Sequence, residues 1–155
     1  MKNNENPEIC AICGGYCCKH YAGCIYPEQL KEITADVLTN MILDGYCFDC
    51  WEGNPTDEKK YENCTAYFLR PKHKDRPYDI MDRSWGGECL FLINNRCKLS
   101  FDDRPLMCQT LEPKGGKECK CPDEYSKRTA AIAWLPYNEL IEQVINLKPS
   151  KGETL

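Results

Sequence analysis

The stretch CAICGGYCC, residues 10–18, places four cysteines within nine positions, and the last two of them are adjacent. A C-x2-C turn lets two sulfurs reach one metal, and sulfur-rich sites in proteins hold zinc or iron–sulfur clusters. The two glycines inside the stretch predict a loop rather than a regular element. The stretch therefore predicts a domain whose loops are held together by bound metal.

A disulfide framework is the alternative use of so many thiols. The chain has 13 cysteines in 155 residues, an odd count that leaves at least one thiol over. Adjacent Cα atoms, as in Cys17 and Cys18, lie ~3.8 Å apart, below the ~4.4–6.8 Å range of disulfides. The first residues, MKNNENPEI, show no apolar segment of a secretory signal. We therefore expect a cytoplasmic protein with reduced cysteines.

The overall charge limits the partners. A net charge of -4 and a pI near 5.3 give no basic field for nucleic acid or anionic lipid. No apolar run approaches the ~18 residues of a membrane span. The sequence thus predicts neither a nucleic-acid nor a membrane partner, and leaves an unidentified protein partner as the expected one.

The remaining pattern predicts one domain over residues 10–147, between flexible termini at 1–9 and 148–155. We expect a small, mainly-α, loop-rich, metal-stabilised domain with one short β-hairpin. Residues 46–64 are predicted as loop. The predicted regular elements are a helix over 27–44, a short strand over 65–71, a hairpin turning at Asn94–Asn95, a short helix within 102–112 that Asp102 or Asp103 caps, and helices over 126–135 and 138–147.

The cysteines outside the first stretch fall into further groups. Cys47 and Cys50 form a second C-x2-C, and Cys119 and Cys121 form a C-x-C. Two such pairs supply the four sulfurs of one tetrahedral site, so they are further candidate metal ligands if their loops converge. The other interpretation is that these four thiols bind no metal. Cys24 and Cys64 lack a paired neighbour and are expected to be small buried residues.

The stretch CAICGGYCC, followed by GECLFLINNRCKLSFDDRPLMCQTLEP, resembles the CxxCxxxCC cysteine-cluster family, the YkgJ type, which is described as a zinc- or iron-chelating domain. The resemblance covers residues 10–113, and YFLRP, SWGGECLFL and AIAWLPY are similar to a subgroup from anaerobic bacteria. Some relatives methylate flagellin lysines, but this chain shows no additional catalytic domain. The metal ligands that the resemblance implies are Cys10, Cys13, Cys17, Cys18, Cys89, Cys97 and Cys108.

Within the same motif, Arg104 is the candidate cofactor-binding residue, as a guanidinium that offsets the charge of nearby thiolates. Its other interpretation is a salt bridge to Asp102 or Asp103. Cys108 is expected early in a short helix, where the helix dipole favours a thiolate. The two histidines, His20 and His73, are expected on the surface, and the other interpretation is that one of them is a metal ligand.

The metal is either zinc or an iron–sulfur cluster, since both accept all-thiolate sites. We favour a [4Fe–4S] cluster, with zinc as the alternative. If Cys89 and Cys97 both lie in the strands of the hairpin, they are about three rungs or ~10 Å apart, too far for one zinc ion. Adjacent cysteines in extended chain also point in different directions. Both features favour two sites or one polynuclear cluster.

Three classes of function remain. The first is an iron–sulfur protein for electron transfer, cluster carriage or redox sensing. The second is a zinc-stabilised protein-interaction module, and the third is a metal-dependent redox or modification enzyme. No acid–base or nucleophile constellation is visible in the sequence, so the question of an enzyme stays open.

Overall fold

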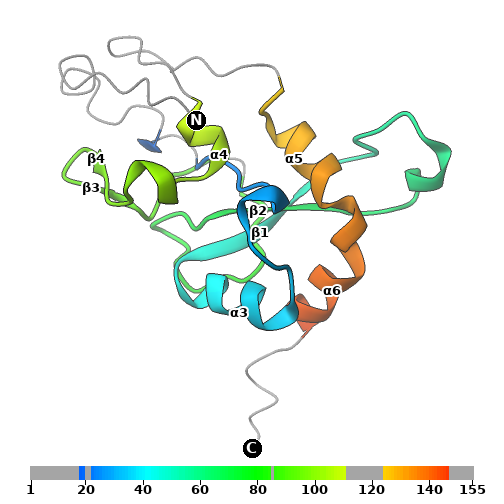
Figure 1. Ribbon diagram of the computed structural model, residues 1–155, viewed down its shortest axis with the longest axis horizontal. Coiled ribbons are helices and arrows are strands. Elements are labelled where there is room, and N and C mark those ends of the chain that lie inside the picture. Colours follow the sequence, from blue (N-terminus) through cyan, green and yellow to red (C-terminus); the bar gives the residue numbers. More distant parts are fainter. Residues whose placement is uncertain (1–17, 20–21, 85, 111–123, 147–155) are drawn as a thin grey trace, which may run out of the picture.

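The computed structural model describes residues 18–19, 22–84, 86–110 and 124–146 (Figure 1). The predicted termini at 1–9 and 148–155 lie outside the described residues. So do Cys10, Cys13, Cys17, Cys119 and Cys121 of the candidate ligands, and His20.

The centre of the molecule is an antiparallel sheet of β1 (Tyr46–Trp51) and β2 (Ala66–Pro71), paired from Tyr46 opposite Pro71 to Trp51 opposite Ala66. Short bridges extend it on both sides, because Ile25 pairs with Leu69 and Phe48 pairs with Met81. Every residue of β2 is buried, which is the burial of a strand covered on both faces.

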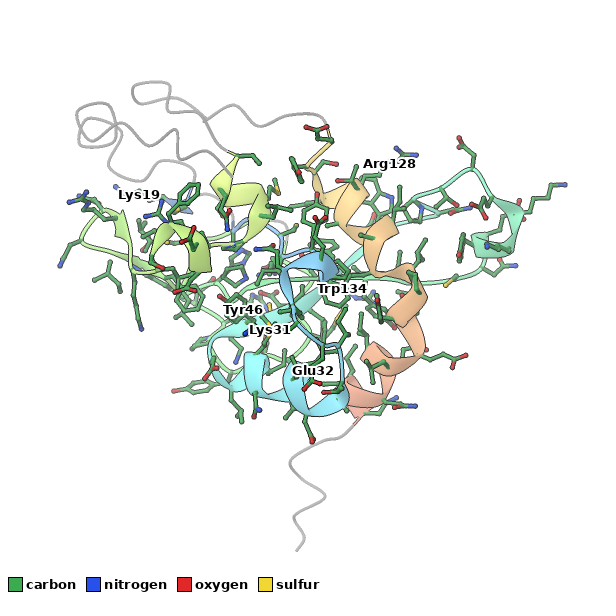
Figure 2. The ribbon with its side chains drawn as sticks, viewed as in Figure 1. Lys19, Lys31, Glu32, Tyr46, Arg128 and Trp134 are labelled. Carbon is green, nitrogen blue, oxygen red and sulfur yellow. The ribbon has the colours of Figure 1, made fainter. Side chains whose placement is uncertain are left out.

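Helices cover this sheet. α3 (Ala35–Leu43) packs against β1 and α6 (Asn138–Asn146), and α5 (Lys127–Trp134) packs mainly against β2 (Figure 1). The indole of Trp134 is fully buried beneath α5 (Figure 2), and its N–H donates to the Ile25 carbonyl at 2.8 Å. The 3₁₀ turn η4 (Leu135–Tyr137) carries Pro136 between α5 and α6, as the sequence predicts.

The helix predicted over 27–44 is split into two pieces. A 3₁₀ turn, η1 (Pro27–Gln29), comes first, and α3 begins only after Thr34, whose hydroxyl accepts from the Val37 N–H at 3.2 Å. The Gln29 side chain explains the break. Its amide oxygen accepts from the Leu106 N–H at 2.7 Å and its amide nitrogen donates to the Arg104 carbonyl at 3.1 Å. These contacts dock the first turn on a segment about 75 residues away, which no local pattern predicts.

The predicted hairpin is present as β3 (Leu92–Ile93) and β4 (Arg96–Cys97), and Asn94 and Asn95 form its turn with φ of 51° and 64°. Asparagine tolerates this left-handed conformation better than most residues. Two further 3₁₀ turns are η2 (Lys59–Tyr61) and η3 (Phe101–Asp103). α4 (Leu106–Gln109) follows Pro105, which is its N-cap, so neither Asp102 nor Asp103 caps it.

The predicted fold class is wrong. Within the described residues the chain forms two antiparallel sheets among short helices, and a mainly-α domain with one hairpin does not describe it. The error lies at residues 46–51, YCFDCW, which were assigned to a loop because of their C-x2-C pair. The segment holds the aromatic residues Tyr46, Phe48 and Trp51 and pairs with the buried strand 66–71, so tertiary pairing makes it β1.

Among the described residues, no helix is both long and apolar enough to cross a membrane.

Candidate metal centre

Four of the predicted ligands come together from three separate parts of the chain. Cys18 lies before the first bridge of the sheet, Cys89 and Cys97 lie around β3 and β4, and Cys108 lies in α4. The Cys89 N–H donates to the Cys18 carbonyl at 2.6 Å. We call Cys18, Cys89, Cys97 and Cys108 the four-cysteine cluster, and it lies at the side of the molecule that carries the hairpin and α4 (Figure 1).

Cys108 is at the centre of this cluster. Burial raises the pKa of its thiol well above the ordinary value, and the charges of Cys18, Cys89 and Cys97 raise that pKa further. A hydrogen bond from the Gly23 backbone acts in the opposite direction. Burial is the largest influence on this thiol, and the helix that carries it, α4, has only four residues.

The backbone between Cys89 and Cys97 does not follow the extended hairpin that the rung count assumed. The Cys89 carbonyl accepts from the Leu92 N–H at 3.1 Å, so the chain turns before β3 instead of continuing the hairpin. Burial raises the pKa of Cys89 to about 11, with a contribution from the nearby Cys97. The Phe91 backbone, Lys74 and Arg70 act to lower it. The ~10 Å separation, which assumed an extended strand, therefore does not apply.

Tyr46 is a neighbour of the cluster that the sequence did not indicate. Burial raises the pKa of its phenol to about 12, and the charges of Cys89, Cys108 and Cys97 add to the effect. Its ring also packs on Phe91 with centroids 5.2 Å apart. Tyr46 is the first residue of β1. Because residues 46–64 were expected to form a loop, the sequence did not predict that Tyr46 lies near the four-cysteine cluster.

The cluster is not a finished ligand set. In the described part of the chain, no three His, Cys, Asp or Glu side chains are arranged so that they could hold a metal ion. The donor chemistry nevertheless fits thiophilic metals, since Cys89 is buried, the other three cysteines are partly buried, and backbone groups of Gly23 and Phe91 favour two of the thiols as thiolates. Cys10, Cys13 and Cys17, which precede Cys18 in the sequence, are outside the described residues.

Arg104 lies between η3 and α4. Its Nε donates to the Leu99 carbonyl at 3.2 Å, and its guanidinium lies 5.9 Å from the centre of the Phe101 ring. The cations that favour the Cys89 thiolate include Lys74 and Arg70, which come from β2 and the segment after it. Lys74 and Arg70 thus offset the negative charge of a Cys89 thiolate, which is the role that the sequence motif predicts for Arg104.

The second C-x2-C is part of β1. Cys47 is opposite Arg70 and Cys50 is opposite Tyr67 in the sheet. Residues three apart in a strand point to opposite faces, with ~10 Å between them along the chain. Burial raises the pKa of Cys47 to about 12 and also raises the pKa of Cys50. The pair is thus not arranged to share one metal, and its predicted partners at 119 and 121 lie outside the described residues.

The two isolated cysteines have different surroundings. Cys24 is fully buried in the core, as predicted. Cys64 is half-buried and lines a cavity of about 520 Å³ together with Asn138, Glu139 and Glu142, among others. Its sulfur accepts from the Asn138 side-chain amide at 2.9 Å. The cavity includes residues just before the N-terminal end of β2. Cys89 instead pairs with His73, just after the C-terminal end of β2.

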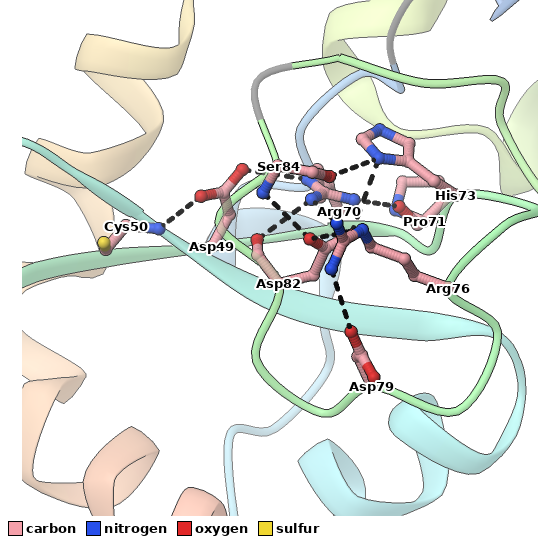
Figure 3. A network of polar contacts seen from close by, with 9 residues as sticks. All are labelled: Asp49, Cys50, Arg70, Pro71, His73, Arg76, Asp79, Asp82 and Ser84. Atoms are coloured by element: carbon pink, nitrogen blue, oxygen red, sulfur yellow. Dashed lines mark hydrogen bonds and ion pairs between the residues drawn. The ribbon is translucent and has the colours of Figure 1, made fainter.

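A buried polar network surrounds Arg70 (Figure 3), and one of its members, His73, pairs with Cys89 of the four-cysteine cluster. The Arg70 guanidinium contacts the carboxylates of Asp49 at 3.0 Å and Asp82 at 3.1 Å. His73 Nδ1 is 2.9 Å from Ser84 Oγ and 3.5 Å from Asp82 Oδ2. The prediction of a surface position for His73 is wrong, because its side chain is only 2% exposed. The strand-like pairing of residue 73 with residue 89 buries it.

No family model, curated protein or solved structure matches this chain. The resemblance to the cysteine-cluster family therefore depends on the sequence motif alone.

A Gly23→Ala substitution tests the packing around Cys108. A Cβ at Gly23 would collide with the Cys108 sulfur and would lie 3.4 Å from the Cys108 nitrogen. We expect a loss of about 1–3 kcal/mol in unfolding free energy, measured by urea denaturation, because an extra methyl group in a packed interior forces side chains and backbone into strained positions. Metal content after anaerobic purification should fall as well.

Gly53→Ala is the control for metal content, since a Cβ there meets no atom within 4 Å. Its positive φ of 83° predicts some loss of stability but no loss of metal. If Gly23→Ala retained wild-type metal content and stability, the close packing of Gly23 on Cys108 would be refuted.

Proposed function

We propose that this chain is a cysteine-cluster metalloprotein that holds an iron–sulfur cluster, with [4Fe–4S] favoured, and serves electron transfer, cluster carriage or redox sensing. The observation that carries the proposal is the convergence of Cys18, Cys89, Cys97 and Cys108 from segments up to 90 residues apart in the sequence. Cys10, Cys13 and Cys17 would complete the donor set through the family motif.

The electrostatics of these thiols support the proposal. Partly or fully buried thiols close to one another are unfavourable as thiolates because their negative charges repel, and a bound cation offsets those charges and so favours deprotonation. Cys47, Cys50, Cys64, Cys89, Cys97 and Cys108 carry free thiols, as metal chemistry requires. Reduced thiols in this number also support a cytoplasmic location.

A bound iron–sulfur cluster would supply one-electron chemistry at a potential that hydrogen bonds and burial adjust. The chain's own contribution would be to bury the sulfurs, to direct the N–H groups of Gly23 and Phe91 at Cys108 and Cys89, and to place Lys74 and Arg70 near Cys89. Electron transfer and cluster carriage both need a second protein, which supports the expectation of a protein partner.

Anaerobic purification with iron, zinc and acid-labile sulfide analysis tests the proposal. We expect brown protein with iron and sulfide in equal amounts and about four of each per chain, the composition of the favoured [4Fe–4S] cluster. A colourless, iron-replete preparation with stoichiometric zinc would replace the iron–sulfur assignment with the zinc-stabilised alternative. A folded chain with no metal and all its thiols titratable would refute metal binding itself.

A further inference from the structure

His73 lies directly opposite Cys89 in a short antiparallel pairing beyond the end of β2. The Leu90 N–H donates to the Lys72 carbonyl at 2.8 Å, and the Lys74 N–H donates to the Glu88 carbonyl at 2.9 Å. Residues 73 and 89 therefore form a non-hydrogen-bonded pair, the closer of the two antiparallel pair types. In such pairs both side chains point to the same face, with Cβ atoms about 4.5–5.5 Å apart.

The imidazole of His73 is held in one orientation. Its Nδ1 faces Ser84 Oγ at 2.9 Å and Asp82 Oδ2 at 3.5 Å (Figure 3). A Cβ at Gly87 would lie 2.7 Å from Cγ of the ring, so the backbone of Gly87 packs directly on it. The ring thus fits between a carboxylate on one side and a backbone that leaves no room for a side chain on the other.

The network also selects the tautomer. Asp82 is held by the Ser84 N–H at 2.8 Å and by Arg70, and these contacts outweigh burial and lower its pKa. The Ser84 hydroxyl is hydrogen-bonded to Asp82, and an ionised carboxylate can only accept, so Ser84 Oγ is left to accept from His73 and the proton is on Nδ1. The lone pair is then on Nε2.

Nε2 of His73 is buried and has no hydrogen-bond partner within the part of the chain that the structure describes. Figure 3 shows it on the ring edge that points away from Asp82 and Ser84. An unsatisfied buried nitrogen costs free energy, roughly 1–3 kcal/mol. A histidine whose Nδ1–H is held by an oxygen acceptor, here Ser84 Oγ, and whose Nε2 carries the free lone pair has the arrangement that metal-ligating histidines use.

We propose that His73 Nε2 is a nitrogen ligand of the metal centre, beside Cys89. The inference rests on the proposed function and adds a ligand that the cysteine motif does not contain. Metal–nitrogen bonds of ~2.0–2.1 Å and metal–sulfur bonds of ~2.3 Å suit donors from two residues paired as closely as 73 and 89. Asp82 and Ser84 are then positioning residues, which fix the ring through Nδ1.

The test uses full-length protein labelled with ¹⁵N-histidine, purified without oxygen and loaded with iron and sulfide. Pulsed electron paramagnetic resonance of the reduced cluster should show a nitrogen coupling that changes from the ¹⁴N to the ¹⁵N pattern on labelling. If the protein takes up zinc instead, NMR of the same label should show one histidine Nε2 resonance shifted by coordination.

The chain has only two histidines, so single variants assign the signal. His20→Gln should leave the nitrogen coupling unchanged, whereas His73→Gln should abolish it. Metal affinity of His73→Gln should fall by at least about tenfold, the lower end of what outer partners of metal ligands cost. If His73→Gln does not fold, the His20→Gln protein still tests the proposal, because any histidine coupling in that protein must come from His73.

The inference is overturned if the metal-loaded wild type shows no histidine coupling or shift, or if the signal survives in His73→Gln and disappears in His20→Gln. The first result would leave an all-cysteine site, and the second would assign the nitrogen ligand to His20; both would leave the proposed function intact. A wild-type chain that binds no metal would instead refute the proposed function, so the two failures are distinguishable.

Discussion

Arg70→Ala is expected to lower the free energy of unfolding by about 3–5 kcal/mol, measured by urea denaturation. The Arg70 side chain is 1% exposed and neutralises the carboxylates of Asp49 and Asp82. It also donates to the Pro71 and Asp82 carbonyls at 2.9 and 3.0 Å. Removing one member of a buried ion pair leaves an uncompensated buried charge, and this is the source of the large loss.

Arg76→Ala is the matched control, because the Arg76 side chain is 51% exposed and its contacts with Asp79 and Asp82 are both 3.8 Å. Exposed pairs of this kind contribute about 0–1 kcal/mol. Arg70→Lys should recover only part of the loss, since an ammonium cannot reproduce three directed N–H donors. An Arg70→Ala protein as stable as Arg76→Ala would contradict the importance of the network.

Cys108→Ser is expected to lower metal affinity by more than about 100-fold, since loss of a ligand costs more than loss of an outer partner. Cys108 is the member of the four-cysteine cluster whose pKa responds to all three others. Metal per chain after anaerobic purification and dialysis against a chelator measures the effect. Circular dichroism of the same sample shows whether the chain is folded.

Cys50→Ser and Cys64→Ser are the controls for this experiment. Cys50 lies in β1 on the face opposite Cys47, and Cys64 lies at the cavity before β2. Both variants should keep the wild-type metal content. A Cys108→Ser protein that keeps it too would show that Cys108 is not a ligand, and a loss of metal in all three would indicate a general effect on folding.

Local signals in the sequence predicted several elements correctly. Asn94–Asn95 predicted the hairpin, Ser126 and Pro136 predicted where α5 begins and where it yields to α6, and the apolar run around Phe68 predicted β2. These features depend on turn chemistry, capping and hydrophobic pattern, which neighbouring residues decide among themselves.

The errors share a cause. The strand β1 was not predicted because its partner, β2, is distant in the sequence. The break after Gln29 was not predicted because Gln29 binds Leu106, which is also distant. The sequence also predicts His73 on the surface. Pairing with Cys89 and the carboxylate of Asp82 bury it instead.

The sequence by itself determined which atoms are available to this protein: 13 thiols, two imidazoles and the C-x2-C-x3-C-C spacing that predicts metal chemistry. The tertiary structure alone decided which of them meet. It brought Cys18, Cys89 and Cys108 together, placed Tyr46 and His73 beside them, and put Cys47 and Cys50 on opposite faces of a strand. Spacing along a chain fixes only local distances, whereas these neighbours depend on strand pairing across 16 or more residues.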